Sequence, residues 1–90
     1  LCIDQAHNGL LILSDGSIVT KDLRLDSCST LTRLDPATLE DLHPPLTLPE
    51  PSMGRIASQN TGGTEYIYIA GQTRIFRVLV QPETLEIDQS

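Results

Sequence analysis

The motif Pro-x-Thr-Leu-Glu occurs twice in the chain, first as Pro36-Ala37-Thr38-Leu39-Glu40 and again, 46 residues later, as Pro82-Glu83-Thr84-Leu85-Glu86. Each copy follows a run of residues that favour β-strands. A period of about 40 to 50 residues with strong β signals is typical of propeller blades and other repeat arrays. The repeat therefore predicts two tandem units, residues 1–50 and 51–90, that together form a fragment of a larger or oligomeric assembly.

The first unit contains a strong hairpin signal. Asp15-Gly16 separates two apolar runs, and glycine tolerates the positive φ that a type I′ turn demands. Pro36 ends a later strand, because proline has no amide hydrogen to donate to a ladder. The strands expected in this unit lie near 9–14, 17–21 and 30–34, with a fourth at either 38–40 or 46–48.

The second unit follows the same plan, with turns expected at 60–63 and 71–73. Its strands are expected at 54–58, 65–70, 74–80 and 85–88. Between the units, prolines at 44, 45, 49 and 51 rule out a helix and leave extended or edge structure. No segment has the apolar spacing of an amphipathic helix. The predicted fold class is all-β.

Two four-stranded antiparallel units can pack as propeller blades or as an eight-stranded β-sandwich or barrel. The repeated motif favours blades, because a sandwich gives no reason for its halves to match. The consecutive apolar residues Leu10 to Leu13 agree, since they predict a strand that is covered on both faces.

The units resemble blades of the loosely related propellers that include quinoprotein-like, YVTN-type and gluconolactonase-like repeats. The residues that carry this resemblance are 15–19, 29–40, 66–71, 76–78 and 82–86. Such rings close with about four to eight blades, so the resemblance implies that further blades or identical chains complete the ring. The chain has no tryptophan, which those quinoprotein blades carry, and no cofactor is predicted.

Charge excludes some classes of partner. The net charge is −6, no Lys/Arg cluster exists and Lys21 is the only lysine. Binding to nucleic acid or an anionic membrane would lack its electrostatic contribution, so neither is predicted. The longest apolar run is far too short to span a bilayer. The chain begins with Leu1 instead of Met, so we expect a processed product, a cloned fragment or part of a longer gene product.

In a propeller, the entry to strand one and the connection between strands two and three share the face where ligands usually bind. The resemblance therefore implies a ligand face, for a small molecule or a protein. Its candidate residues are His7, Asn8, Lys21, Asp22, Arg24, Asp26, Arg55 and Gln72. His7 is either a general base or metal ligand in a central channel, or a side chain bonded to a nearby turn.

No catalytic or metal-binding motif appears. Asp22, Asp26 and Asp35 lack the glycine and terminal Glu of a calcium-binding loop, so a solvated acidic loop is expected there. Neither a nucleophile elbow nor a phosphate-binding loop is present. The sequence predicts no metal site and no catalytic residue in this chain.

The two cysteines leave the compartment open. Cys2 and Cys28 fit no zinc motif. They are either free thiols or, on the ligand face of the blades, a disulfide whose loop closure would stabilise the fold by about 3–4 kcal/mol. A disulfide would indicate a secreted or periplasmic protein.

Three functions follow as hypotheses. The preferred one is a non-enzymatic propeller segment that acts as a scaffold or binding module. The second is part of a secreted or periplasmic propeller hydrolase or dehydrogenase whose catalytic residues lie mostly outside this chain, with His7, Asn8 and Arg55 facing the channel. The third is a small β-sandwich recognition domain linked by Cys2 and Cys28.

Overall fold

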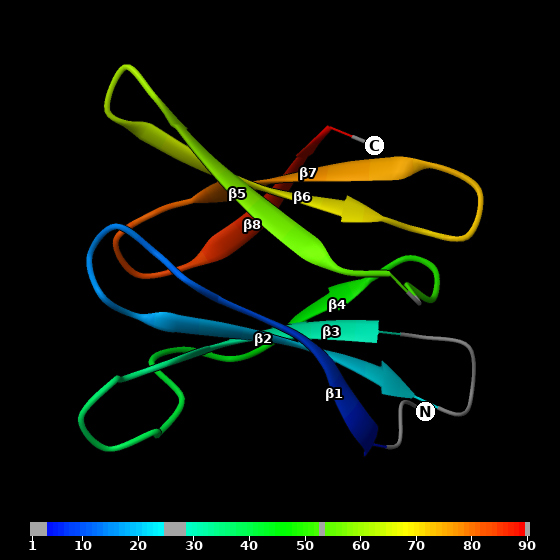
Figure 1. Ribbon diagram of the computed structural model, residues 1–90, viewed down its shortest axis with the longest axis horizontal. Coiled ribbons are helices and arrows are strands. Elements are labelled where there is room, and N and C mark those ends of the chain that lie inside the picture. Colours follow the sequence, from blue (N-terminus) through cyan, green and yellow to red (C-terminus); the bar gives the residue numbers. More distant parts are fainter. Residues whose placement is uncertain (1–3, 25–28, 53, 90) are drawn as a thin grey trace.

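The computed structural model describes residues 4–24, 29–52 and 54–89. In these residues all regular structure is β, arranged as two four-stranded antiparallel sheets (Figure 1). The all-β prediction is confirmed.

Each sheet is a simple meander in which neighbours in sequence are neighbours in space. The first sheet has the order β1-β2-β3-β4, and the second has the order β5-β6-β7-β8. The strands are β1 (Asp4–Ile12), β2 (Ile18–Arg24), β3 (Ser29–Leu34), β4 (Leu46–Leu48), β5 (Ile56–Thr61), β6 (Thr64–Ala70), β7 (Ile75–Val80) and β8 (Leu85–Gln89).

The two copies of the repeated motif diverge after the third strand. In the second unit, Leu85 is buried and begins β8 directly. In the first unit, Leu39 is exposed and has a φ of 61°, a left-handed conformation that is costly for leucine. The fourth strand forms only at 46–48, the later of the two expected positions. Its short length agrees with the prolines on both sides of it.

The first hairpin turn differs from the predicted conformation, which the second hairpin adopts instead. At the β1–β2 connection, Gly16 has a φ of 90° but Asp15 does not have a positive φ, so the predicted type I′ turn is wrong. Leu13 N instead donates to Ser17 O and Gly16 N to Leu13 O, both at 2.9 Å, which closes a three-residue connection. The type I′ turn lies in the β5–β6 hairpin, where Gly62 and Gly63 have φ values of 58° and 85°.

The hydrophobic core lies between the two sheets. Because side chains alternate along a strand, each sheet turns one set of residues toward the other sheet. The buried members are Leu13, Val19, Leu31, Leu48, Ile67, Ile69, Phe76, Val78 and Leu85. Full burial of each such side chain stabilises the fold by roughly 1.5–3 kcal/mol.

The first strands of the two sheets run parallel to one another. The middle of β1 lies beside the start of β5, since a Cβ built on Gly9 would be 3.5 Å from Ile56 Cγ1. Beyond the C-terminal end of β1, Ser14 binds Glu65, which follows the β5–β6 turn. In Figure 1 both strands run from right to left. Two meanders whose first strands are adjacent and parallel have the same orientation. The sheets therefore pack front to back, which means that one face of the first sheet contacts the opposite face of the second.

Front-to-back packing leaves one face of each sheet uncovered by the other. On the first sheet this face carries Leu10 and Ile12, which are 66% and 57% exposed. On the second sheet it carries Ile75, which is 66% exposed, and Tyr66, whose ring lies 4.7 Å from the Arg77 guanidinium carbon. The run 10–13 thus divides into two residues that face the core and two that face outward.

Candidate functional site

Ser52 joins the two sheets through polar contacts. Its carbonyl accepts from Lys21 Nζ at 2.6 Å and from Asn8 Nδ2 at 3.1 Å. Its amide donates to Ser29 Oγ at 2.9 Å, and its hydroxyl donates to Ala70 O at 2.7 Å. Lys21 Nζ also donates to Ser52 Oγ at 2.9 Å. The segment between β4 and β5 is therefore fixed to both sheets at one residue.

A lysine amine beside a serine hydroxyl is an arrangement that can activate a nucleophile. Here Ser52 and Lys21 are both fully buried, and the serine hydroxyl donates to a backbone carbonyl. A substrate has no access to this pair, so we interpret it as structural. Burial lowers the pKa of Lys21, because the charged ammonium loses its hydration.

This pKa shift predicts how stability depends on pH. The pKa of Lys21 in the folded protein lies below the ordinary value of 10.5. In the pH interval between that lowered pKa and 10.5, the unfolded chain binds more protons than the folded protein does. The free energy of unfolding of the wild type, relative to Lys21→Met, should therefore rise as the pH increases through that interval toward 10.5. Urea unfolding of both proteins at several alkaline pH values measures this difference. A difference that is constant or falls with pH would contradict the prediction.

A cleft of about 300 Å³ lies where the middle of β1 meets the start of β5. Its lining residues are Asn8, Gly9, Leu10, Arg55 and Ile56. Asn8 occupies a β-bulge, because His7 pairs with Asp22 and Gly9 with Lys21, which leaves Asn8 without an opposite residue. Bulges redirect a side chain, and here the Asn8 amide reaches the carbonyl of Ser52.

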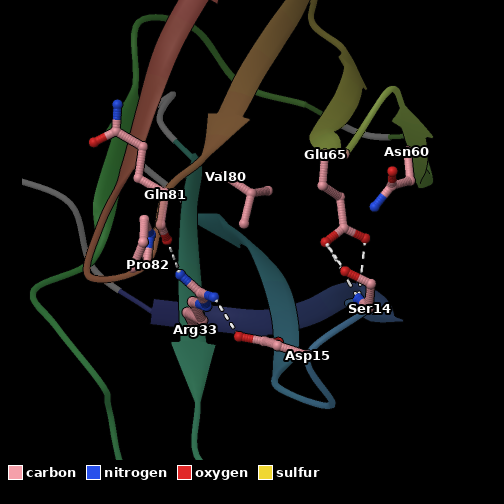
Figure 2. A pocket seen from close by; sticks show the side chains of 9 residues that line it. Ser14, Asp15, Arg33, Asn60, Glu65, Val80, Gln81 and Pro82 are labelled. Carbon is pink, nitrogen blue, oxygen red and sulfur yellow. Dashed lines mark hydrogen bonds and ion pairs between the residues drawn. The ribbon is translucent and has the colours of Figure 1, made fainter.

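A second cleft, of about 230 Å³, lies at the opposite end of the sheets and is shown in Figure 2. Arg33 of β3 is buried at its edge and makes three contacts. Its Nε donates to Ser17 Oγ at 3.0 Å, its Nη1 to Gln81 O at 2.6 Å and its Nη2 to Asp15 Oδ2 at 2.7 Å. Because Gln81 belongs to the second sheet's β7–β8 connection, Arg33 links the sheets at this end.

The carboxylates of this second cleft are also bound by protein groups. Two donors of Ser14, the backbone amide and the hydroxyl, bond the Glu65 carboxylate, with the hydroxyl at 2.8 Å. The Ser17 hydroxyl and amide, followed by the Arg33 guanidinium, hold the pKa of Asp15 below its ordinary value. The charged groups of this cleft thus bind protein groups, and we interpret it as a junction between the sheets.

Glu50 binds the β6–β7 turn from the segment after β4. Its carboxylate accepts from Thr73 N at 2.6 Å and from Thr73 Oγ1 at 2.8 Å, and it lies 3.4 Å from Arg74 Nε. The Thr73 amide is the main cause of the lowered pKa of Glu50. This turn is therefore held in place by the connection between the two units.

The structure brings together only some of the residues expected on the ligand face. Asn8 and Arg55 line one cleft, and Gln72 is exposed in the β6–β7 turn. Lys21 differs from the expectation, because its side chain points between the sheets and is fully buried, and Asp22 is also buried. For His7 and Arg24 the structure gives the backbone placement in β1 and β2. Asp26, Cys2 and Cys28 lie outside the described residues, as does the proposed disulfide.

Sequence reasoning did not identify Ser52, Arg33 or Glu50 as organising residues. For Arg33 a signal existed, since it lies two positions after Leu31 and must share the face of that core residue. Ser52 and Glu50 lie in a proline-rich connection that has no periodic pattern, so no local signal marked them.

Comparisons of the chain with known protein families, with characterised proteins and with solved structures find no match. Among the described residues, no three His, Cys, Asp or Glu side chains are grouped so that they could hold a metal ion. In the same residues, no helix is long and apolar enough to cross a membrane.

Proposed function

We propose that this chain is a two-blade segment of a β-propeller that serves as a scaffold, and that the outer faces of its two sheets bind further blades. The observation that carries the proposal is the front-to-back packing of two meanders with parallel, adjacent first strands. If the two sheets instead packed with like faces together, through a two-fold axis perpendicular to the strands, adjacent first strands would be antiparallel. Successive blades around a ring have parallel ones, with each first strand beside the central channel.

Front-to-back packing also determines which faces complement each other. Each sheet has an inner face, which contacts the other sheet, and an outer face, which does not. The outer face of the second sheet corresponds to the inner face of the first sheet. The outer face of the first sheet corresponds to the inner face of the second sheet. A second copy of the chain would therefore bind head to tail, with its Leu10 and Ile12 face against the Tyr66 and Ile75 face of the first copy. Contacts of this heterologous type close into rings.

The exposed apolar residues supply the driving force for this contact. Leu10, Ile12 and Ile75 are each more than half exposed, and each sits on a sheet face whose neighbouring strands are also partly apolar. Burial removes such side chains from water at a gain of roughly 25 cal/mol for each Å² of apolar surface. The scaffold role follows from this assembly.

Two variants test the head-to-tail arrangement. The first, Leu10→Lys with Ile12→Lys, blocks the outer face of the first sheet. The second, Ala57→Lys with Ile75→Lys, blocks the outer face of the second sheet, on which the exposed Ala57 lies opposite Tyr68. We expect the wild type to assemble beyond a dimer in light scattering, each variant alone to be monomeric, and an equimolar mixture to form a one-to-one dimer through the two intact faces.

Other results would overturn the proposal. A wild type that stays monomeric at high concentration would remove the scaffold role. A variant that remains dimeric when one face is blocked would indicate that like faces bind each other, which is the contact expected of a sandwich-type dimer. Circular dichroism of each variant checks that the β-structure is kept, since all four substituted positions are exposed.

A further inference from the structure

The repeated motif shows which residues of β3 and β7 are equivalent. Arg33 and Leu79 each lie three residues before the proline of the motif, and Leu34 and Val80 each lie two residues before it. Arg33 lies on the inner face of the first sheet, where it is buried, and the half-buried Leu79 lies on the outer face of the second. Because side chains alternate along a strand, Leu34 points to the outer face of its sheet and Val80 to the inner face of its own.

One row of residues crosses the outer face of the first sheet at the end nearest the β1–β2 turn. Ile12 pairs with Ile18 on the next strand, and Ile18 pairs with Leu34 on the strand after that. Ile12 is exposed, and Ile18 and Leu34 are half-buried. The row is therefore apolar across three strands and accessible to a partner.

The equivalent row of the second sheet lies on its inner face and is mostly polar. It includes Val80, which packs against the core. Because Tyr66 pairs with Leu79, the residue beside Val80 on β6 is Glu65, and Glu65 pairs with Asn60 on β5. The equivalent residues are therefore Leu34 and Val80, Ile18 and Glu65, and Ile12 and Asn60.

The polar row and Arg33 line the cleft shown in Figure 2. Inside the chain, the guanidinium of Arg33 binds Gln81 O and the carboxylate of Glu65 binds Ser14. On the outer faces, Leu79 takes the place of Arg33 and Ile18 takes the place of Glu65. The guanidinium and this carboxylate are thus each replaced by an apolar side chain, one on each outer face.

We propose that Leu79 of one chain docks against the apolar row of Ile12, Ile18 and Leu34 on a second copy, at the position equivalent to the polar cleft. This inference rests on the head-to-tail assembly proposed above and identifies the residues that meet in it. Apolar side chains that face each other gain free energy by leaving water together. The match between the two faces supports a second copy as the occupant, because a charge on only one of them would be buried without a partner.

Two single variants restore the charges of the inner contact to the outer one. Leu79→Arg introduces the residue type of Arg33, and Ile18→Glu introduces that of Glu65. Each variant alone sets a charge against apolar side chains of the next copy. We expect each to raise the dissociation constant of the assembly at least tenfold, as measured from the concentration dependence of light scattering. Circular dichroism checks that each variant keeps its β-structure.

The double variant Leu79→Arg with Ile18→Glu tests whether the two positions meet. They lie on opposite outer faces of one chain, separated by the thickness of both sheets, so the new charges can pair only across a contact between copies. We expect the double variant to assemble at least ten times more tightly than the two single effects combined would give. This gain should shrink in about 1 M salt, because ions screen the attraction.

Gln72→Arg and Gln72→Glu are the matched controls, since they change the net charge equally at an exposed residue of the β6–β7 turn, at the opposite end of the sheets. Both should leave the dissociation constant unchanged. If the wild type assembles and either the single variants assemble as tightly or the double variant shows no gain, this inference is overturned and the head-to-tail proposal stands. A monomeric wild type would overturn both.

Discussion

Arg33→Ala should lower the free energy of unfolding by about 2–4 kcal/mol, because it removes three hydrogen bonds and leaves a cavity. The substitution leaves Ser17 Oγ and Gln81 O without the donor they have now. It also removes the contact with Gln81 that ties β3 to the second sheet. For a chain of this length, with a total stability of roughly 5–13 kcal/mol, this is a large fraction.

Urea unfolding followed by circular dichroism measures the effect. The midpoint should fall while the slope of free energy against urea stays the same, because the surface exposed on unfolding hardly changes. Arg33→Lys should lose less than Arg33→Ala, since a lysine keeps the charge and part of the stem but cannot contact three acceptors in the fixed geometry of a guanidinium.

Arg55→Gln is the matched control for stability. Arg55 is exposed and has no partner among the described residues, so its substitution should change the free energy of unfolding by less than about 0.5 kcal/mol. If Arg33→Ala also changes the free energy of unfolding by less than about 0.5 kcal/mol, the three contacts of Arg33 do not stabilise the junction between the sheets.

The burial of Arg33 can be predicted from the sequence, whereas the conformation at Leu39 cannot. Alternation along a strand is a local rule, and by itself it places Arg33 on the same face as the core residue Leu31. The repeated motif suggests that Leu39 and Leu85 are equivalent, yet one is exposed in a left-handed turn and the other begins a strand. Closely similar short stretches adopt the conformation that their surroundings stabilise, and in the first unit the fourth strand forms only at Leu46.

The candidate cleft depended on information that the sequence does not contain. Asn8 and Arg55 were both expected on one face, because strand order alone brings the entries to the two first strands together. The bulge at Asn8 and its contact with Ser52, 44 residues away, could not be predicted, since each depends on the packing of two sheets. Lys21 was expected at the rim because of its place near the connection between the second and third strands, although its alternation with Val19 indicates the buried face.

Gly71→Ala should lower the free energy of unfolding by about 2–3 kcal/mol, because the added Cβ meets atoms that cannot all move away. It would lie 2.6 Å from Glu50 Oε1, 2.7 Å from Phe76 Cε2 and 2.9 Å from Arg74 O. Phe76 is fully buried in the core and Arg74 O is a backbone atom that accepts from Gly71 N at 2.8 Å. Thermal and urea unfolding of the variant measure the loss.

Gly54→Ala is the matched control for Gly71→Ala, because it measures the effect of replacing a glycine by alanine at a position without close contacts. Neither Gly54 nor Gly71 has a positive φ, so the backbone suits alanine at both positions. At Gly54 the nearest atom to an added Cβ is Ala70 Cβ at 3.9 Å, an ordinary contact, and the variant should be as stable as the wild type or up to about 1 kcal/mol more stable. Adding Glu50→Ala to Gly71→Ala should restore little stability, since Phe76 and Arg74 O remain in place. Full recovery in that double variant would mean that Glu50 alone opposes the methyl group and that the β6–β7 turn has room to adjust.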